Sequence, residues 1–203
     1  MDGLKSVDKE FILKLEELIR SRRSIRKFKK DAVSKELITK IIEMGCWAPS
    51  GKNCQNWRFF VVTGKKRDEY LKYSQKSWLG IKDYLQQKLK PSLYEFTERF
   101  FFTLGDAPVL VFCYTKNDPH ERYLTSVGSV YMAVQTIILA AQAHGLGTCA
   151  MGAPLEIKEE VDAFIGSERV KGLELLCGIA IGWPDHSPPP APRQMEERIN
   201  WLE

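Results

Sequence analysis

The 203-residue chain has a formal net charge of +4, with 44% hydrophobic and 28% charged residues, the composition of an ordinary soluble globular protein. Its length suits a single domain over residues 1–203. Much of the positive charge falls within residues 20–30. Such a local excess fits one anionic ligand better than a nucleic-acid-binding face, which needs a wide basic stripe, so we expect no nucleic-acid partner.

Cysteine and histidine usage bears on metal sites and on the redox compartment. The five cysteines show no CxxC spacing, and the three histidines pair with no cysteine at metal-ligand spacing. We therefore expect reduced thiols, a cytoplasmic location and no metal site. Charges near the N-terminus argue against a signal peptide, and the most apolar stretch, residues 130–143, is too short to cross a bilayer. No targeting segment and no membrane association are expected.

Two helices and a basic stretch between them are predicted at the N-terminal end. Residues 8–20 repeat apolar side chains at helical spacing, which predicts an amphipathic helix. Ser34 opens a second helix, which ends near Gly45. Residues 22–28 lie between them as a loop or a short extended segment.

Residues 22–28, the basic segment, combine cations, a hydroxyl and apolar side chains in seven positions. The polar groups are those of Arg22, Arg23, Ser24 and Arg26. Arginine offers two parallel donors to phosphate oxygens, so these groups could close on a compact dianion such as a phosphate. Ile25 and Phe28 would anchor the segment to a core. The alternative is a solvated basic run with no ligand.

A polar loop over residues 48–57 follows the second helix. Pro49 and Gly51 favour turns within it, and its hydrogen-bond donors and acceptors come from Ser50, Asn53 and Gln55. Two interpretations stay open, a ligand-binding loop and side chains that only satisfy the loop's own backbone. Residues 57–63 are rich in aromatic and β-branched residues and predict a strand.

Residues 65–104 form a weakly patterned helical region, which Gly80 and Pro91 are expected to break. Nine aromatic residues fall within it. Two interpretations fit them equally well: helices that cover a core, and a mobile lid with an aromatic-lined pocket.

The C-terminal half alternates strands and helices. Strands are predicted over residues 109–114 and 173–181, and a helix over residues 154–165. Residues 125–144 are apolar nearly all round, which predicts a central buried helix.

The tail predicts an extended arm over residues 183–193, because five prolines fall there, and a short element over residues 196–203. Three widely spaced strands with long helices between them indicate an α+β or layered α/β fold.

Residues 145–150 match the spacing G-x-G-x-x-A of a dinucleotide fingerprint. That motif leaves a strand and enters a helix, whereas these residues follow a predicted helix. We therefore expect a helix end and then a tight loop over residues 148–152, with backbone N–H groups that could face a ligand. No HExxH, GxSxG or P-loop motif occurs. A cofactor that carries the chemistry would explain this lack.

Taken in order, the basic segment, the polar loop and residues 145–148 resemble the FMN-dependent nitroreductase family, and the late Pro192-Arg193 pair also matches. The resemblance implies an α+β, three-layer α/β/α sandwich with a mixed, mainly antiparallel sheet. It also implies an intertwined homodimer with two FMN molecules bound across the interface. Residues 65–104 would be a variable lid, and residues 183–203 a C-terminal arm.

The resemblance further implies which residues bind FMN: Arg22, Arg23, Ser24, Arg26, Pro49, Ser50, Asn53, Gln55, Met151, Gly152 and Arg193. Arg193 would join the arginines on the phosphate, and Arg26 would lie nearest the pyrimidine edge of the flavin. The polar loop would come at least partly from the partner subunit. Two positions depart from the family pattern. Asn56 replaces a proline, which would soften the loop, and no lysine follows Arg193.

The implied activity is oxidation of NADH or NADPH and reduction of a small, electron-poor acceptor by ping-pong hydride transfer. The acceptor would be a nitroaromatic, a quinone or an activated enone, and no side chain is predicted to act as a catalytic group. Two alternatives within the superfamily stay open, a reductive dehalogenase and a flavin-consuming oxygenase. A non-catalytic FMN-binding redox sensor, or a basic module for nucleic acid or membrane surfaces, is a further alternative.

Overall fold

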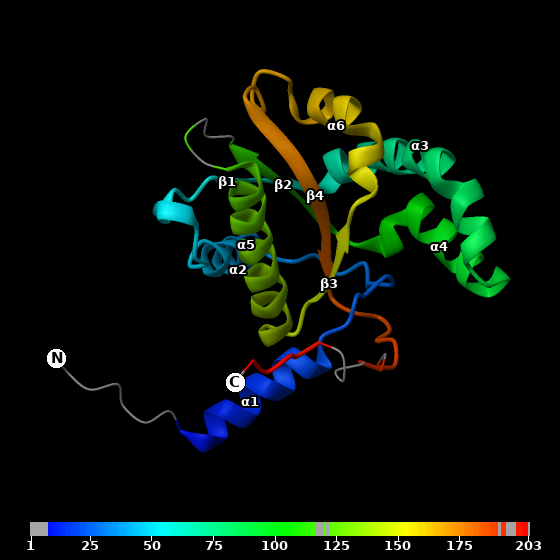
Figure 1. The fold of residues 1–203 in the computed structure, drawn as a ribbon. Coiled ribbons are helices and arrows are strands. Elements are labelled where there is room, and N and C mark those ends of the chain that lie inside the picture. Colours follow the sequence, from blue (N-terminus) through cyan, green and yellow to red (C-terminus); the bar gives the residue numbers. More distant parts are fainter. Residues whose placement is uncertain (1–7, 117–119, 121, 191, 194–197, 203) are drawn as a thin grey trace.

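The computed structural model describes residues 8–116, 120, 122–190, 192–193 and 198–202. A four-stranded antiparallel sheet lies at its centre, with helices on both faces (Figure 1). The strand order is β1-β2-β4-β3, and the strands are β1 (Trp57–Thr63), β2 (Val109–Lys116), β3 (Gly147–Met151) and β4 (Leu173–Gly182). This arrangement confirms the predicted α+β sandwich.

The two central strands, β2 and β4, are buried along almost their whole length. Both run as nearly continuous apolar segments, as expected for strands covered on both faces. The register places Cys113 opposite Cys177, and the pairing shifts by a bulge between Cys113 and Tyr114. The two outer strands, β1 and β3, form the edges of the sheet.

Each face of the sheet carries its own apolar cluster. On one face, α2 (Lys35–Gly45) and α5 (Tyr123–Ala143) bury residues such as Ile41 and Ile137 against the strands. On the other face, α3 (Gly64–Lys88) and α6 (Lys158–Ile165) pack on β2, with the Tyr70 ring 4.9 Å from that of Phe112 and 5.4 Å from that of Phe164. These aromatic rings fasten the start of α3 to the sheet.

Helix α5 is only partly the buried helix that its composition predicted. Eight of its residues are buried, but Tyr131 and Met132 are 45% and 43% exposed. By length and composition the 21-residue helix could cross a membrane, so the expectation that this segment is too short was wrong. In the structure its buried face packs against the sheet, as core helices of soluble proteins do.

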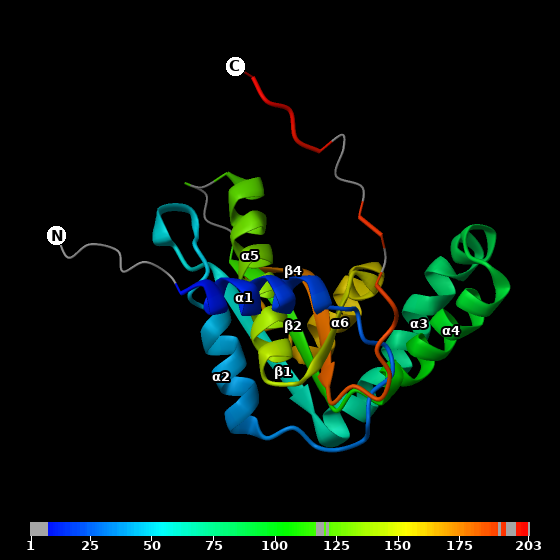
Figure 2. The ribbon, with the colours of Figure 1, turned by 90° about the horizontal axis from the view of Figure 1, so that it is seen from below.

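Helices α3 and α4 (Pro91–Thr103) form a hairpin that projects from the sheet (Figures 1 and 2). The predicted break at Gly80 is wrong, because α3 runs through it and ends at Lys88. A single glycine costs a helix only about 1 kcal/mol, which the packing of Trp78 against Tyr94 and Phe101 offsets. Pro91 begins α4, as proline does at a first helical position.

The predicted loop over residues 148–152 is wrong at its centre. Residues Gly147–Met151 form β3, which pairs with β4 from Gly147 opposite Gly182 to Met151 opposite Gly178. Next comes the 3₁₀ turn η3 (Ala153–Ile157), and then α6. The pairing joins segments about thirty residues apart, and five residues carry too short an alternation to show it locally.

Helix α1 (Lys9–Ser21) and the described part of the arm lie outside the sandwich. Helix α1 is capped by Asp8, but none of its residues is buried, and its apolar side chains such as Phe11 face outward. The arm leaves β4 without forming a further helix or strand in its described residues (Figure 2). The predicted element over residues 196–203 begins outside the described residues, and residues 198–202 form no helix or strand.

Candidate functional site

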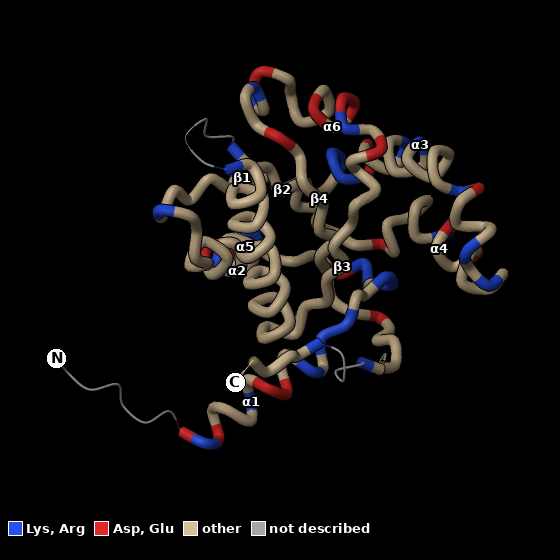
Figure 3. The backbone as a smooth tube through the Cα atoms, viewed as in Figure 1, with Lys and Arg blue, Asp and Glu red and all other residues tan. Residues whose placement is uncertain are grey.

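The basic segment is fastened to the end of the sheet next to β3. Ile25 and Phe28 are buried, at 5% and 3% exposure, which confirms the predicted anchors. The Ile25 amide donates to the carbonyl of Thr148 at 2.8 Å, and the Phe28 amide donates to that of Gly105 at 2.7 Å. Two anchors three residues apart hold the cations between them in place. In Figure 3 a stretch of the chain rich in Lys and Arg lies beside β3.

Two glycines allow this close approach. A Cβ atom at Gly105, whose φ is +61°, would lie 2.3 Å from the carbonyl oxygen of Arg26. At Gly147 it would lie 2.7 Å from Cγ1 of Ile25. Since real Cβ atoms essentially never lie within 3.0 Å of such atoms, glycine at these two positions permits the basic segment to lie in its observed position.

Two of the predicted flavin-binding cations lie close to β3. Burial raises the pKa of the Cys149 thiol, and the guanidinium groups of Arg26 and Arg22 oppose that rise. Arg26 also lines a cavity together with Met151 and Gly152. A single protomer therefore brings together four predicted site residues that are far apart in the sequence.

Arg23 holds an unpaired donor. Its Nη1 donates to the carbonyl oxygens of Arg20 and Arg22, at 2.7 and 2.8 Å, at the end of α1. Among the described residues, its Nε is the one enclosed side-chain nitrogen or oxygen without a hydrogen-bond partner. Arg23 also lines a cavity of about 200 Å³ with Ser21 and Gln142. An enclosed guanidinium N–H without a partner is unusual in a folded protein, and it makes Arg23 a candidate to bind an anionic group such as the phosphate of FMN.

The polar loop lies elsewhere in the protomer. Its Gly51 amide donates to Ser129, in the first half of α5, whereas the basic segment pairs with β3 beyond the end of that helix (Figure 1). Within the loop, the Gln55 amide donates to Oγ of Ser50, and the Gln55 side chain donates to Oδ1 of Asn53. The exposed Pro49 leads into this turn. One protomer therefore does not bring Pro49, Ser50, Asn53 and Gln55 to the basic segment.

The polar loop is strained and firmly held. Lys52, Asn53 and Gln55 all adopt positive φ, between 46° and 55°. Left-handed backbone costs about 1–2 kcal/mol for each residue other than glycine, so surrounding contacts must hold it. Asn56 is buried, and its side chain donates to Oγ1 of Thr115 at 2.6 Å and to the carbonyl of Ser126 at 3.1 Å. The expectation that Asn56 softens the loop was wrong, because it ties the loop to β2 and α5.

The arm begins beside the basic segment. Lys27 forms an ion pair with Asp185 at 2.5 Å, and the Asp185 amide donates to the Lys27 carbonyl. The Lys29 amide donates to the carbonyl of Trp183. Arg193 lies further along the arm and is exposed. Its predicted place on the phosphate stays a prediction.

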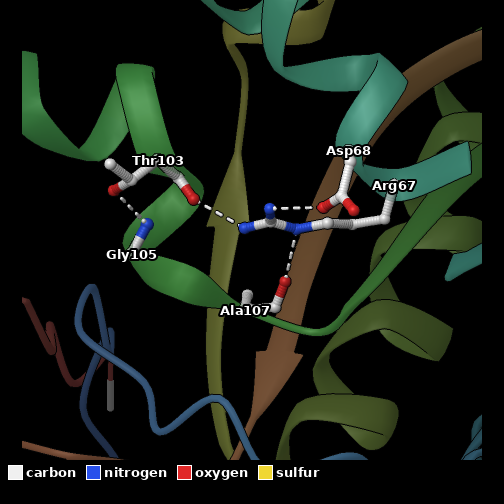
Figure 4. Close-up of polar contacts among 5 residues, drawn as sticks. All are labelled: Arg67, Asp68, Thr103, Gly105 and Ala107. Carbon is white, nitrogen blue, oxygen red and sulfur yellow. Dashed lines mark hydrogen bonds and ion pairs between the residues drawn. The ribbon is translucent and has the colours of Figure 1, made fainter. Parts of the chain in front are cut away.

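Arg67, which the sequence reasoning missed, supports the basic segment from behind. Its guanidinium donates to the carbonyls of Thr103 and Ala107, at 2.6 and 2.7 Å, and pairs with Asp68 (Figure 4). These bonds hold the turn after α4, whose Gly105 carbonyl accepts from Phe28. Nothing in the sequence marks Arg67 among the many cations of α3.

Comparison with known proteins decides the family. The family model described as "Nitroreductase family" matches residues 19–183. The chain belongs to the nitroreductase family. Membership confirms the resemblance that the ordered motifs indicated, and it covers both the basic segment and the polar loop.

Relatives and solved structures are similar to this nitroreductase-family chain over most of its length. Iodotyrosine deiodinase from Thermotoga neapolitana is 30% identical over 88% of this chain and 93% of its own. Nitroreductase NfnB from Mycolicibacterium smegmatis is 28% identical, covering 84% and 82% of the two chains. A BluB-like flavoprotein from Clostridium difficile 630 has a TM-score of 0.73 and 27% identity, covering 93% of this chain and 99% of its own. A nitroreductase with bound FMN from Desulfitobacterium hafniense also has a TM-score of 0.73, with 25% identity over 93% and 97%.

Proposed function

We propose that the protein oxidises NADH or NADPH and reduces a small, electron-poor acceptor, such as a nitroaromatic, a quinone or an activated enone. The enzyme class follows from the family, since the chain is an NAD(P)H-dependent flavin oxidoreductase whose cofactor is FMN. The observation that carries the assignment to these residues is the anchored basic segment, in which Arg23 lines a cavity and keeps an unpaired Nε.

In this proposal, the residues of this chain bind and orient FMN. Arg22 and Arg23 would hold the phosphate, with Ser24 and Arg193 beside them. Arg26 would place positive charge at the pyrimidine edge, where electron density rises on reduction. Met151 and Gly152 would bring backbone next to the ring. Bound FMN supplies the exchange of a hydride, so no side chain needs to act as nucleophile or general acid. Donor and acceptor would use the same face in turn, which is a ping-pong scheme.

We also propose that the enzyme is an intertwined homodimer. Apolar residues of α1 and α5 are exposed, and a groove of about 860 Å³ is lined by α2, the end of β1, the start of α3 and the start of β2. The arm presents Ile199, Trp201 and Leu202, all more than half exposed. An open edge strand and exposed apolar side chains favour pairing with a second chain. In such a dimer, the polar loop of one protomer could complete the site of its partner.

The first experiment is an absorbance spectrum of the purified protein, repeated anaerobically after addition of NADPH or NADH. Flavin bands that bleach on addition are the expected result. Bands that persist would contradict the proposed reductase activity and favour a sensor. A colourless protein that takes up no FMN would contradict the flavin site. Size-exclusion chromatography with light scattering on the same sample tests the dimer.

A second candidate is reductive dehalogenation, which the 30% identity to an iodotyrosine deiodinase favours. It uses the same flavin site but a halogenated aromatic acceptor. Iodide release from iodotyrosine by the reduced enzyme would support it, and reduction of nitroaromatics with no iodide release would exclude it.

The three buried, free cysteines fit a reducing compartment, and we propose the cytoplasm.

A further inference from the structure

Arg67 is the one charged residue that is buried within the described part of the chain, at 8% exposure. Its carboxylate partner is Asp68, whose side chain is 68% exposed, so the ion pair does not enclose the charge. Charged side chains are almost never buried unless they are paired, because burial removes their hydration. The position of Arg67 inside the protein therefore calls for partners other than Asp68.

Two backbone carbonyls are those partners, and they lie on either side of one turn. The 3₁₀ turn η2 (Leu104–Asp106) follows α4 and precedes β2. Nη2 of Arg67 donates to the carbonyl of Thr103, just before the turn, and Nε donates to that of Ala107, just after it (Figure 4). The planar guanidinium therefore bridges the two ends of η2.

The bridged turn is strained. Leu104, Gly105 and Asp106 follow one another with φ of 52°, 61° and 65°, and two of the three are not glycine. Such left-handed backbone is unfavourable for residues with a side chain, and it persists only where surrounding contacts hold it. The two bonds from Arg67 are contacts of that kind, together with the bond that the Gly105 amide donates to Oγ1 of Thr103.

The turn η2 also supports the basic segment. Its Gly105 carbonyl accepts from the Phe28 amide at 2.7 Å, and a Cβ atom at Gly105 would lie 2.3 Å from the carbonyl oxygen of Arg26. The backbones of η2 and Arg26 are therefore in direct contact. A shift of η2 would move the backbone that carries the Arg26 guanidinium.

We propose that Arg67 is a positioning residue for the flavin cofactor, because it fixes η2 and thereby the place of the Arg26 guanidinium. The inference rests on the proposed function, which puts Arg26 at the pyrimidine edge of FMN. Electrostatic stabilisation of developing charge depends on where the charged group is held. Arg67 acts through η2 and Arg26 and takes no part in the transfer of the hydride.

The first measurement is hydrogen exchange of backbone amides, followed by nuclear magnetic resonance on the full chain as purified. The Phe28 and Ile25 amides belong to the same segment, but the Phe28 amide bonds to Gly105 in η2 and the Ile25 amide bonds to Thr148 in β3. Arg67→Met removes both donors to the turn. Because two hydrogen bonds are lost, Phe28 should exchange about tenfold faster relative to Ile25 than in wild type. Equal acceleration of both amides would show a general loss of stability and overturn the inference.

The second measurement is the midpoint potential of bound FMN, by anaerobic spectroelectrochemistry. Relative to free FMN, this potential gives the ratio of the affinities for reduced and oxidised flavin, and a tenfold change in that ratio is about 30 mV for a two-electron couple. Arg26→Ala should lower the ratio about tenfold or more, since it removes a charged partner of the reduced ring. Arg67→Met leaves that cation but lets it move away, so it should lower the ratio about fivefold.

A double-mutant cycle tests whether Arg67 acts through Arg26. When Arg26 is already alanine, adding Arg67→Met should leave the affinity ratio within about twofold of that of Arg26→Ala alone. Additive changes would show that Arg67 affects the flavin by another route and would overturn the inference.

Two further variants separate the bridge from the charge. Arg67→Lys keeps the charge but replaces the planar fork by a single nitrogen. It should lower the affinity ratio in the same direction as Arg67→Met, and it takes the place of that variant if Arg67→Met lowers the yield of folded protein. A wild-type potential in Arg67→Lys would show that charge alone matters and overturn the inference. Asp68→Asn removes the ion pair and keeps both carbonyl bonds, so it should change neither the exchange nor the potential.

The two measurements distinguish failure of the inference from failure of the proposed function. Faster exchange at Phe28 alone, in a protein that takes up no FMN, would leave the link from Arg67 to the basic segment in place and refute the proposed function. Bound FMN that NADPH or NADH reduces, with a potential that Arg67→Met does not change, would refute the inference and leave the proposed function in place.

Discussion

The basic segment and the polar loop carry the two halves of the predicted flavin site, and the fold holds them in opposite ways. The basic segment is extended, unstrained and fixed by buried side chains and backbone bonds to β3 and the turn at Gly105. The polar loop contains three non-glycine residues with positive φ and depends on the side chain of Asn56. The basic segment holds positive charges in fixed positions, whereas the polar loop holds a particular backbone conformation.

The difference suggests separate contributions to binding. Arginines on a rigid support give affinity for an anion, because little freedom is lost on binding. The strained polar loop fixes the positions of its hydrogen-bond donors and acceptors toward a neighbouring molecule, and it adds little charge. Since the two halves lie apart in one protomer, the comparison predicts that only a dimer joins them.

The largest effect is expected from removing the charge. Arg22→Ala with Arg23→Ala should weaken FMN binding about 100-fold or more, because charge-assisted hydrogen bonds contribute about 1.5–3 kcal/mol each. Titration of flavin fluorescence measures this. Lys29→Ala with Lys30→Ala removes the same charge from exposed positions outside the predicted site and should change the affinity only a few-fold. Equal losses in both pairs would show that general attraction, rather than the anchored arginines, binds the phosphate.

Subunit complementation tests whether the two halves meet across an interface. A variant defective in the basic segment, Arg23→Ala, is co-expressed with a variant defective in the polar loop, Asn53→Ala with Gln55→Ala. If each site combines both halves from different chains, random pairing leaves about a quarter of the sites intact, while each variant alone is inactive. Absence of recovery in light-scattering-verified mixed dimers would place both halves of a site in one chain.

Gly105→Ala should destabilise the support of the basic segment. The new Cβ would meet the Arg26 carbonyl, and φ of +61° is unfavourable for alanine. We expect the free energy of unfolding to fall by about 2–3 kcal/mol and FMN affinity to fall with it. Gly80→Ala is the matched control, since nothing lies within 4 Å of its Cβ in α3. It should raise stability by about 0.5–1 kcal/mol, as measured by urea unfolding.

Asn56→Ala should loosen the polar loop and leave the basic segment intact. It removes two buried hydrogen bonds, so the free energy of unfolding should fall by about 2 kcal/mol. A double-mutant cycle with Thr115→Val isolates the bond to Thr115, which should appear as a coupling energy of about 1 kcal/mol. Coupling near zero would contradict the role of Asn56 as the loop's anchor.

The smallest effect concerns the ion pair between Lys27 and Asp185. Its hydrogen bond from Lys27 holds the pKa of the Asp185 carboxyl below its usual value. A carboxyl with a lowered pKa adds stability above its unfolded pKa of about 3.9, and that contribution is lost as pH falls through the lower folded value. The stability difference between wild type and Asp185→Asn should therefore be small at pH 7 and vanish once the pH lies below the lowered pKa of the folded state. An exposed pair adds little. A difference that grows in acid would contradict this assignment.

Much of the fold could be predicted because it depends on local patterns. Apolar spacing and caps placed α1, α2 and α5, and β-branched runs placed β1, β2 and β4. The anchors Ile25 and Phe28 were visible because two apolar residues interrupt a basic run. Strand β3 was missed, since five residues owe their conformation to pairing with β4.

The sequence by itself determined the family, the order of the motifs and the residues that carry charge, because these depend on residue type and spacing. Tertiary structure alone decided that Gly105 lies against the Arg26 carbonyl, that Arg67 holds the turn beside it, and that Asn56 stiffens its loop. It also decided that Tyr70 and Ser74 line the same cavity. Such contacts join segments distant in sequence, and no local periodicity encodes them.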